Sequence, residues 1–479
     1  MNMKRSLVLY IFFIGICGFL IWLVIHSGQD LISNNDHVDA VRKLSGKTKP
    51  VVFSSEETLW EQFSHNIKSP LGILLLQIIT ILFVSKLFGN IITRFRQPSV
   101  VGEMIAGIFL GPSIVGFIFP EFSSFVFPND SLANLQFLSQ IGLAFFMFII
   151  GMELDIEKLK NKAHNAIVIS HVSIIFPYLL GVSTAYLIYE SFAPANVGFT
   201  VFALFIGIAV SITAFPVLAR ILQERKLTKT SLGAIVIACA AFDDVTAWCI
   251  LAMVIAIAKA GSIVSALFTI ILTLIFVLVM IYGVRRWIDK AAKRYTQSEN
   301  LNKTFVVLVF FVLLVSAYIT ETIGIHALFG AFLAGVIMPH KSNIKEMLMS
   351  KIEDVSILLL LPIFFAFTGL RTQIGLLNEM DLWITCGLII FVAILGKFGG
   401  SAAAARLTGY NWKDSLSIGA LMNTRGLMEL IVLNIGYDLG ILSPTLFTIF
   451  VIMALATTFM TGPLLDVIEF FWRKKSVAR

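Results

Sequence analysis

Long apolar stretches recur along almost the entire chain, and short polar connections separate them. An α-helix rises about 1.5 Å per residue, so roughly 20 apolar residues cross the hydrocarbon core of a bilayer. Stretches near this length lie at about 7–25, 70–92, 97–119, 132–152, 167–189, 196–221, 231–258, 262–284, 303–321, 323–339, 352–370, 382–405, 415–437 and 442–466. The pattern predicts an all-α membrane protein with about fourteen transmembrane helices.

Basic residues follow the alternation of these spans. With the N-terminus placed in the cytoplasm, 26 of the 36 Lys and Arg residues fall in cytoplasmic segments. Seven fall outside, and three (Lys86, Lys397 and Arg425) lie within spans. The positive-inside rule therefore predicts a plasma (inner) membrane protein with both termini in the cytoplasm. This distribution explains the net charge of +7 by membrane topology and lipid contact, without a nucleic-acid partner.

The same pattern predicts the domain organisation. Residues 1–26 form an N-terminal transmembrane anchor or a signal peptide, and 27–69 form an extracytoplasmic loop. Residues 70–466 form the transmembrane domain, and 467–479 form a basic cytoplasmic tail. We have no expectation for the role of the 27–69 loop.

Composition adds little beyond this class. The chain is 58% hydrophobic and 14% charged, which is typical of a multi-pass membrane protein. Its four cysteines lie in apolar stretches, so they read as buried apolar residues rather than a disulfide or zinc framework. No phosphate-binding loop, metal-ligand spacing or nucleophile triad is apparent, so we expect neither an enzyme nor a cofactor.

Two spans carry helix-breaking or polar residues where a plain span would be apolar. The span at 196–221 contains Ser211, Thr213 and Pro216, and a proline inside a helix removes a backbone donor. Interrupted membrane helices are tolerated only where protein or a cavity satisfies the freed backbone groups. Two kinked helices without a function remain the alternative.

The second such span, 415–437, reads GALMNTRGLMELIV. Asn423, Thr424 and Gly426 favour local unwinding around Arg425. The two interrupted spans are seven apart and therefore cross the membrane in opposite directions. This predicts inverted repeats, at about 70–258 and 303–466, whose two broken helices mark a transport site.

Two adjacent acids, Asp243 and Asp244, lie near the midpoint of the span at 231–258. A carboxylate at that depth costs roughly 3 kcal/mol even by low estimates, so packing alone does not explain the pair. Neighbours on a helix are about 100° apart, so both can face one polar seam. A carboxylate that holds either a proton or a cation would be an exchange device. A structural pair neutralised by a basic residue is the alternative.

Lys397 lies near the middle of the span at 382–405, at a depth where it can meet the aspartates. Glycines around it permit close helix packing. An ion pair with Asp243 would offset its burial, and displacement of that pair by sodium would let Lys397 release a proton. A purely structural salt bridge is the alternative.

Arg425 and Glu429 are one helical turn apart and are expected to pair, balancing partial charges where the broken helices meet. The hydroxyls of Ser211 and Thr213 are possible oxygen ligands for a hard monovalent cation. Pro216, Asn423 and Thr424 support the breaks.

Five segments together resemble the monovalent cation:proton antiporter-2 family. They read RFRQPSVVGEMIAGIFLGPS, SITAFPVLARILQERKL, FDDVTAWCILA, LPIFFAFTGLRT and LMNTRGLMELIVLNIG. The resemblance covers about residues 70–466 in matching order. It implies the sodium/proton antiporter fold, with two crossed discontinuous helices, a homodimer, and elevator-like alternating access.

The family's site residues fall on matching positions. By this resemblance Asp244 is the carboxylate that binds the proton and the cation (Na⁺ or K⁺), and Asp243 pairs with Lys397. An Asp–Asp pair with this lysine is associated in the family with electrogenic sodium/proton exchange. The motifs DDVTAW and NTRGLMELIVLNIG are nearer to the plant cation/proton exchangers, many of which transport potassium.

We therefore expect an antiporter that exchanges Na⁺ for H⁺ and contributes to pH homeostasis, with K⁺/H⁺ exchange as the alternative. A gated cation channel using the same carboxylates is the alternative of a different class. It is disfavoured because the chain contains no carbonyl-lined filter loop of the potassium-channel type. A membrane sensor that transports nothing is a third hypothesis.

Overall fold

In the computed structural model, the structure describes residues 66–95, 97, 99–153, 163–227, 230–260, 263–295, 303–339 and 342–477, together with Phe19 and Trp22. Two compact units are recognised, 1–67 and 68–479, and the helices described below belong to the second. No strand occurs among the described residues, which confirms the all-α class.

Eleven helices in the described part of the chain are long and apolar enough to cross a membrane. Two shorter apolar helices, Phe199–Ser211 and Ala327–Val336, coincide with the predicted spans at 196–221 and 323–339. These thirteen elements match the predicted spans between 70 and 466. The first predicted span, 7–25, and nearly all of the predicted 27–69 loop lie outside the described residues.

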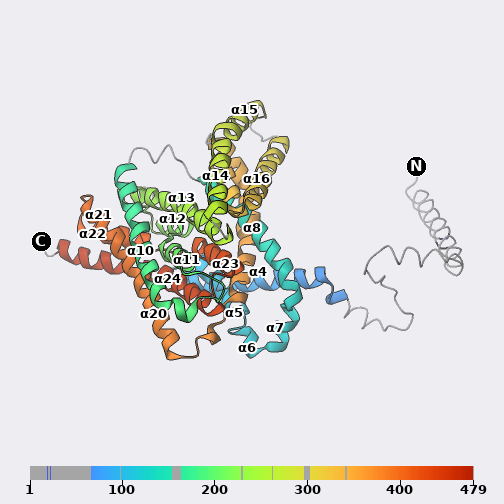
Figure 1. The fold of residues 1–479 in the computed structure, drawn as a ribbon, viewed down its shortest axis with the longest axis horizontal. Coiled ribbons are helices and arrows are strands. Elements are labelled where there is room, and N and C mark those ends of the chain that lie inside the picture. The colour runs from blue at the N-terminus through green and yellow to red at the C-terminus, as the bar shows by residue number, and fades with distance from the viewer. Residues whose placement is uncertain are drawn as a thin grey trace, which may run out of the picture. The chain divides into compact units, whose positions relative to one another are not determined.

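Helices far apart in the sequence gather into two bundles (Figure 1). The first bundle comprises α4 (Pro70–Arg94), α5 (Ser99–Leu110), α8 (Leu132–Glu153), α16 (Lys303–Ile323), α17 (Ala327–Val336) and α19 (Leu361–Arg371). The second comprises α10 (Ala163–Phe192), α11 (Phe199–Ser211), α12 (Phe215–Glu224), α13 (Ser231–Ala260), α20 (Met380–Ile394), η6 (Leu395–Gly399), α21 (Gly400–Leu407), α22 (Trp412–Met422), α23 (Leu427–Asp438) and α24 (Pro444–Val477).

Each half of the chain contributes to both bundles in the same order. The first half supplies α4, α5 and α8 to the first bundle and α10 to α13 to the second. The second half supplies α16, α17 and α19, and then α20 to α24. The order of helices is therefore the same in the two halves.

The remaining helices connect these parts. Between the halves, α14 (Ile263–Leu278) continues through the π-helical turn η3 (Val279–Val284) into α15 (Arg285–Tyr295). In the second half, α18 (Ser342–Val355) continues through the π-helical turn η4 (Ser356–Leu360) into α19. Shorter connecting elements are α6 (Val115–Ile118), α7 (Pro120–Val126), η1 (Asn129–Ser131) and η5 (Ile374–Leu376).

Glycines set the closest helix crossings in the first bundle. A Cβ at Gly335 on α17 would overlap the carbonyl oxygen of Phe148 on α8, and a Cβ at Gly151 would overlap that of Phe332. Between α5 and α19, a Cβ at Gly369 would overlap the backbone of Gly107, and a Cβ at Gly107 would overlap the carbonyl oxygen of Phe365. Both crossings pair one helix from each half, so backbone contact between small residues joins the halves of this bundle.

We predict that Gly335→Ala destabilises the protein by about 1–3 kcal/mol, because backbone atoms surround the added methyl group and the helices must separate. Gly387→Ala, on α20, is the matched control, since nothing lies within 4 Å of its added Cβ. Thermal unfolding of both variants in detergent checks this. Equal midpoints would show that the α8–α17 crossing tolerates the extra volume.

Candidate functional site

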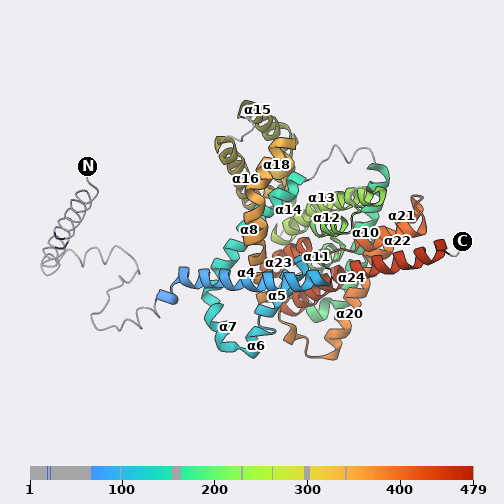
Figure 2. The ribbon, with the colours of Figure 1, turned by 180° about the vertical axis from the view of Figure 1, so that it is seen from behind.

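Two broken helices meet at their breaks inside the second bundle. The helix from α11 to α12 is interrupted at 212–214, and the helix from α22 to α23 is interrupted at 423–426. The Ala214 backbone N–H donates to the Thr424 carbonyl at 3.0 Å, so each break supplies a hydrogen-bond partner to a backbone group of the other. The helices α11 and α12 lie beside α23 in both views (Figure 2). This confirms the predicted pair of crossed discontinuous helices.

Local sequence explains where the helices stop. Ile212 adopts extended backbone angles. Pro216 lies in the first turn of α12, where backbone N–H groups have no intrahelical partner, so the proline is tolerated there. Gly426 has φ of +129°, a conformation that strains any other residue. Gly426 therefore permits the sharp turn at the start of α23.

Arg425 neutralises the end of the neighbouring broken helix. Its guanidinium donates to the Ala209 carbonyl at 3.0 Å and also to the Val210 carbonyl, both in the last turn of α11. The carbonyls at a helix C-terminus lack intrahelical partners and carry partial negative charge, which a guanidinium balances. Arg425 also pairs with Glu429 at 3.3 Å, and both side chains are fully buried. The predicted pairing is present, with the α11 carbonyls as additional partners.

Asp243 lies in a complete hydrogen-bonded network. Lys397 forms an ion pair with its Oδ2 at 2.7 Å, and neither side chain is more than 1% exposed. The same oxygen accepts from Thr213 at 2.7 Å and from Ser173 at 3.1 Å, and Oδ1 accepts from Ser170 at 2.6 Å. The predicted contact between Asp243 and Lys397 is therefore present, and the charge of Asp243 is neutralised.

The Lys397 ammonium uses all three of its donors. Besides Asp243, it donates to the carbonyl and the hydroxyl oxygens of Ser173 on α10, each at 2.9 Å. Lys397 lies in the π-helical turn η6, a feature that often marks functional sites in helices. Gly396, next to it, lies so near Pro177 of α10 that an added Cβ would be 2.6 Å from the proline Cβ. Close packing against α10 therefore places the Lys397 ammonium next to Asp243.

Asp244 has the opposite environment. It is buried, and neither of its carboxylate oxygens has a hydrogen-bond partner among the described residues. The backbone N–H of Phe215, at the start of α12, interacts with it electrostatically without meeting hydrogen-bond geometry. An ionised carboxylate in this position needs a counter-charge. A proton or a small cation would supply one, so the arrangement is suited to binding either.

Asn423, at the second break, is also buried, with neither amide atom paired among the described residues. The carbonyls on either side of it contact the first break: Met422 O lies 3.2 Å from the Thr213 hydroxyl, and Thr424 O accepts from Ala214. Asn423 was expected only to support the break. Its unpaired amide oxygen makes it a further candidate ligand.

The hydroxyl groups predicted as ligands are already hydrogen-bonded. Ser211 donates to the Ile208 carbonyl of its own helix at 3.1 Å, and Thr213 donates to Asp243. A hydroxyl has one proton but two lone pairs, so both oxygens keep the ability to accept or ligate. No group of three His, Cys, Asp or Glu side chains suited to a metal ion occurs among the described residues.

The sequence pattern did not indicate that Ser170 and Ser173 are partners of Asp243. They lie on α10, in the apolar run IVISHVSIIF, where single serines give no distinctive signal. Their spacing of three residues places both on one helical face, which is the only feature that could have indicated a shared partner.

Residues 78–468 match the family described as "Sodium/hydrogen exchanger, transmembrane". The chain belongs to this sodium/hydrogen exchanger family.

Among its relatives, the Na(+)/H(+) antiporter NhaS4 of Synechocystis sp. is 43% identical over 393 residues, which are 82% of this chain and 96% of the relative. The K(+)/H(+) antiporter 1 of Saccharomyces cerevisiae is 34% identical over 85% of this chain, which spans about half of that relative (47%). Plant cation/H(+) antiporters of Arabidopsis thaliana also match. These relatives are antiporters rather than enzymes, in agreement with the sequence prediction.

The fold is shared with a solved antiporter structure. The sodium proton antiporter MjNhaP1 of Methanocaldococcus jannaschii superposes with a TM-score of 0.62 at 15% identity, covering 84% of this chain and 97% of that one. The match confirms the sodium/proton antiporter fold expected from the sequence. It also agrees with a multi-pass membrane protein.

We predict that Arg425→Met destabilises the protein by about 3–5 kcal/mol, because Glu429 and the α11 carbonyls lose a buried cationic donor. Glu429→Gln should cost much less, since Arg425 keeps its carbonyl partners. Thermal unfolding in detergent, including the double variant Arg425→Met/Glu429→Met, measures the coupling. If the double variant is no more stable than Arg425→Met alone, the buried Glu429 charge contributes nothing to that loss.

Proposed function

We propose that this protein is a secondary active antiporter that exchanges Na⁺ for protons across the plasma membrane, with both ions competing for Asp244. The observation that carries the proposal is the unequal environment of the two carboxylates. Asp243 forms an ion pair with Lys397 and accepts hydrogen bonds from three hydroxyl groups, whereas Asp244 is buried without a hydrogen-bond partner among the described residues.

Competition follows from this arrangement by charge alone. With Asp243 neutralised by Lys397, one further positive charge balances Asp244, and two would not be tolerated in the same low-dielectric space. Proton and cation therefore bind alternately. Carboxylate, amide and hydroxyl oxygens are the ligands that a hard cation prefers, and Asp244, Asn423 and Thr213 supply these types.

Lys397 is proposed as the group that couples charge to transport. A cation that approaches Asp244 also attracts the Asp243 carboxylate, which weakens the hold of Asp243 on Lys397. The lysine, whose isolated ammonium would be costly to keep buried, then releases its proton to water on the side to which the site is open, and the bound cation takes the place of the ammonium beside the two carboxylates. A purely structural role for this ion pair remains the alternative, and the charge moved per cycle distinguishes the two.

Alternating access is proposed to move the second bundle relative to the first, with a homodimer as the assembly. Polar contacts between the bundles occur at the ends of the helices. Arg371 on α19 pairs with Asp438 on α23 at 2.7 Å, and the Gln97 amide donates to the Phe459 carbonyl of α24 at 3.3 Å. These bonds, together with those of Asn434 to Thr368 and Arg371 and that of Gln136 to Asp438, would need to break for the bundles to slide. The cytoplasmic position of both termini rests on the distribution of basic residues.

Potassium is the alternative substrate, favoured by the similarity to a yeast protein named as a K(+)/H(+) antiporter. A channel using the same site would also let cations cross, but it could not move them against their gradient. Transport driven uphill by an imposed pH difference therefore separates an antiporter from a channel, and the response to each cation identifies the substrate.

We predict that Asp244→Asn abolishes exchange, because the neutral amide cannot take up a proton and has no charge to balance a bound cation. Purified protein in proteoliposomes with an acidic interior and a clamped potential is tested by adding Na⁺ or K⁺ outside. Dequenching of an entrapped pH-sensitive dye reports proton exit. Asp381→Asn, an exposed acid in the first turn of α20, is the matched control and should behave as wild type. Full activity in Asp244→Asn would refute the proposed role.

We predict that Lys397→Ala lowers transport and changes the net charge moved per cycle. Without the ammonium, Asp243 must itself bind a proton, so the cycle loses the lysine as a proton carrier. Current measurements on a solid-supported membrane, compared with cation uptake in the same vesicles, give the charge stoichiometry. An unchanged stoichiometry in an active, folded variant would leave Lys397 with a structural role only.

A further inference from the structure

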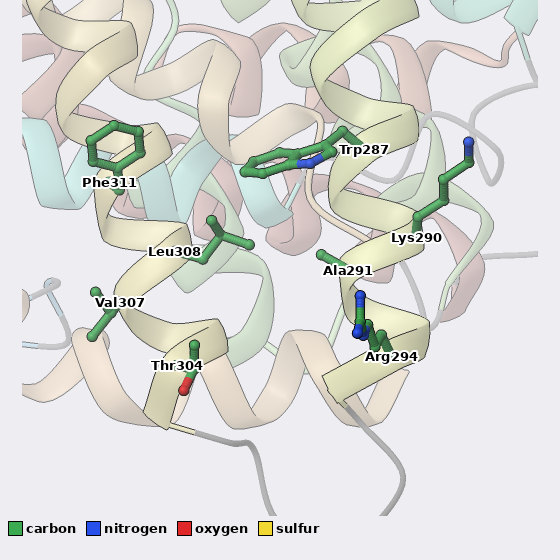
Figure 3. A pocket seen from close by; sticks show the side chains of 8 residues that line it. All are labelled: Trp287, Lys290, Ala291, Arg294, Thr304, Val307, Leu308 and Phe311. Carbon is green, nitrogen blue, oxygen red and sulfur yellow. The ribbon is translucent and has the colours of Figure 1, made fainter.

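A cavity lies between α15 and α16, and neither aspartate is in its lining (Figure 3). Its volume is about 470 Å³. Apolar side chains, including Trp287, Leu308 and Phe311, share its lining with the basic Lys290 and Arg294. In Figure 3 the Trp287 ring extends from α15 toward α16. The proposed exchange mechanism does not use this cavity.

Charge excludes a role as a vestibule for the transported cation. The two ionisable groups in the lining are both basic, so a monovalent cation is repelled there. Arg285, Arg286 and Lys293 add further positive charge to α15, against the single acid Asp289. The cavity therefore favours a ligand with a negative group.

The apolar part of the lining continues along the outer face of α16. Four of its side chains are largely exposed: Val307 (65%), Phe311 (61%), Leu314 (56%) and Tyr318 (73%). Their spacing of four, three and four residues places them on one face of the helix. In a membrane-spanning helix this face meets acyl chains. A soluble anion would use the basic groups but leave this stripe without a role.

We infer that this cavity binds an anionic phospholipid of the cytoplasmic leaflet, with its phosphate at Lys290 and Arg294 and an acyl chain along the α16 stripe. Basic pockets between transmembrane helices at the cytoplasmic side attract anionic headgroups, and Trp287 is the residue type enriched at the membrane interface. The leaflet rests on the orientation predicted from the basic residues, whereas the ligand class rests on the cavity itself.

The location gives such a lipid a route to transport. The segment from α14 to α15 joins the two halves; α14 packs on α13, which carries the aspartates, and also on α16 of the first bundle. A lipid between α15 and α16 therefore stabilises the contact of this connector with the first bundle, against which the second bundle is proposed to move.

Full-length protein in a neutral detergent provides the test, with thermal unfolding followed as phosphatidylglycerol or phosphatidylcholine of the same chain length is added. We expect phosphatidylglycerol to raise the unfolding midpoint more. The double variant Lys290→Ala/Arg294→Ala should need at least about tenfold more phosphatidylglycerol than wild type for the same rise in the unfolding midpoint. The matched control Arg286→Ala/Lys293→Ala removes the same charge from exposed positions of α15 outside the cavity and should respond as wild type.

Three outcomes would overturn the site. These are equal stabilisation by both lipids, an equal loss in the control variant, and full stabilisation by glycerol 3-phosphate, which would indicate a phosphate site without an acyl component. If the double variant does not fold, Lys290→Gln and Arg294→Gln are titrated singly. Asp244→Asn should keep the lipid response, so failure of the lipid site and failure of the proposed transport function are separable.

Discussion

The buried ion pair between Asp243 and Lys397 is the interaction on which the polar centre depends. Two carboxylates and an ammonium in one low-dielectric space are tolerable only if each charge is neutralised. At 2.7 Å, with three hydroxyl donors besides, Asp243 satisfies this condition in the structure. Asp244 satisfies it only with a proton or a cation. While the pair is formed, its neighbour Asp244 therefore still requires one positive charge.

The same constraint explains the elements around the pair. Breaking two membrane helices exposes backbone groups that lipid cannot satisfy, so the breaks are placed against each other. Ala214 and Thr424 supply one backbone bond, and Arg425 covers the carbonyls at the end of α11. Arg425 also pairs with Glu429 at 3.3 Å, so the acid and the α11 carbonyls together balance its charge. The polar groups of the crossing therefore serve as partners for one another.

Much of this was predictable from the sequence, because buried charge is rare in membrane spans and therefore informative. Depth alone indicated that Lys397 can meet the aspartates, and Pro216 and Gly426 located the breaks through backbone restriction. The expectation that Asp243, and not Asp244, is the partner of Lys397 came from the family resemblance, because depth alone does not decide it. Adjacent residues face directions about 100° apart, and which one meets Lys397 depends on how α13 is rotated against α10. Ser170 and Ser173 remained hidden for a related reason, since a serine in an apolar helix usually bonds its own backbone.

The distribution of charge between the halves accounts for their mutual dependence. The first half contributes the acids Asp243 and Asp244, and the second contributes the bases Lys397 and Arg425. In the second half, Thr457 and Thr458 lie about as far from the start of α24 as the aspartates lie from the start of α13. Their hydroxyls donate to carbonyls of their own helix. The halves therefore share an order of helices but not of charges. Asp243 of the first half is neutralised by Lys397 of the second, so the charge that makes the centre suitable for ion exchange also joins the repeats.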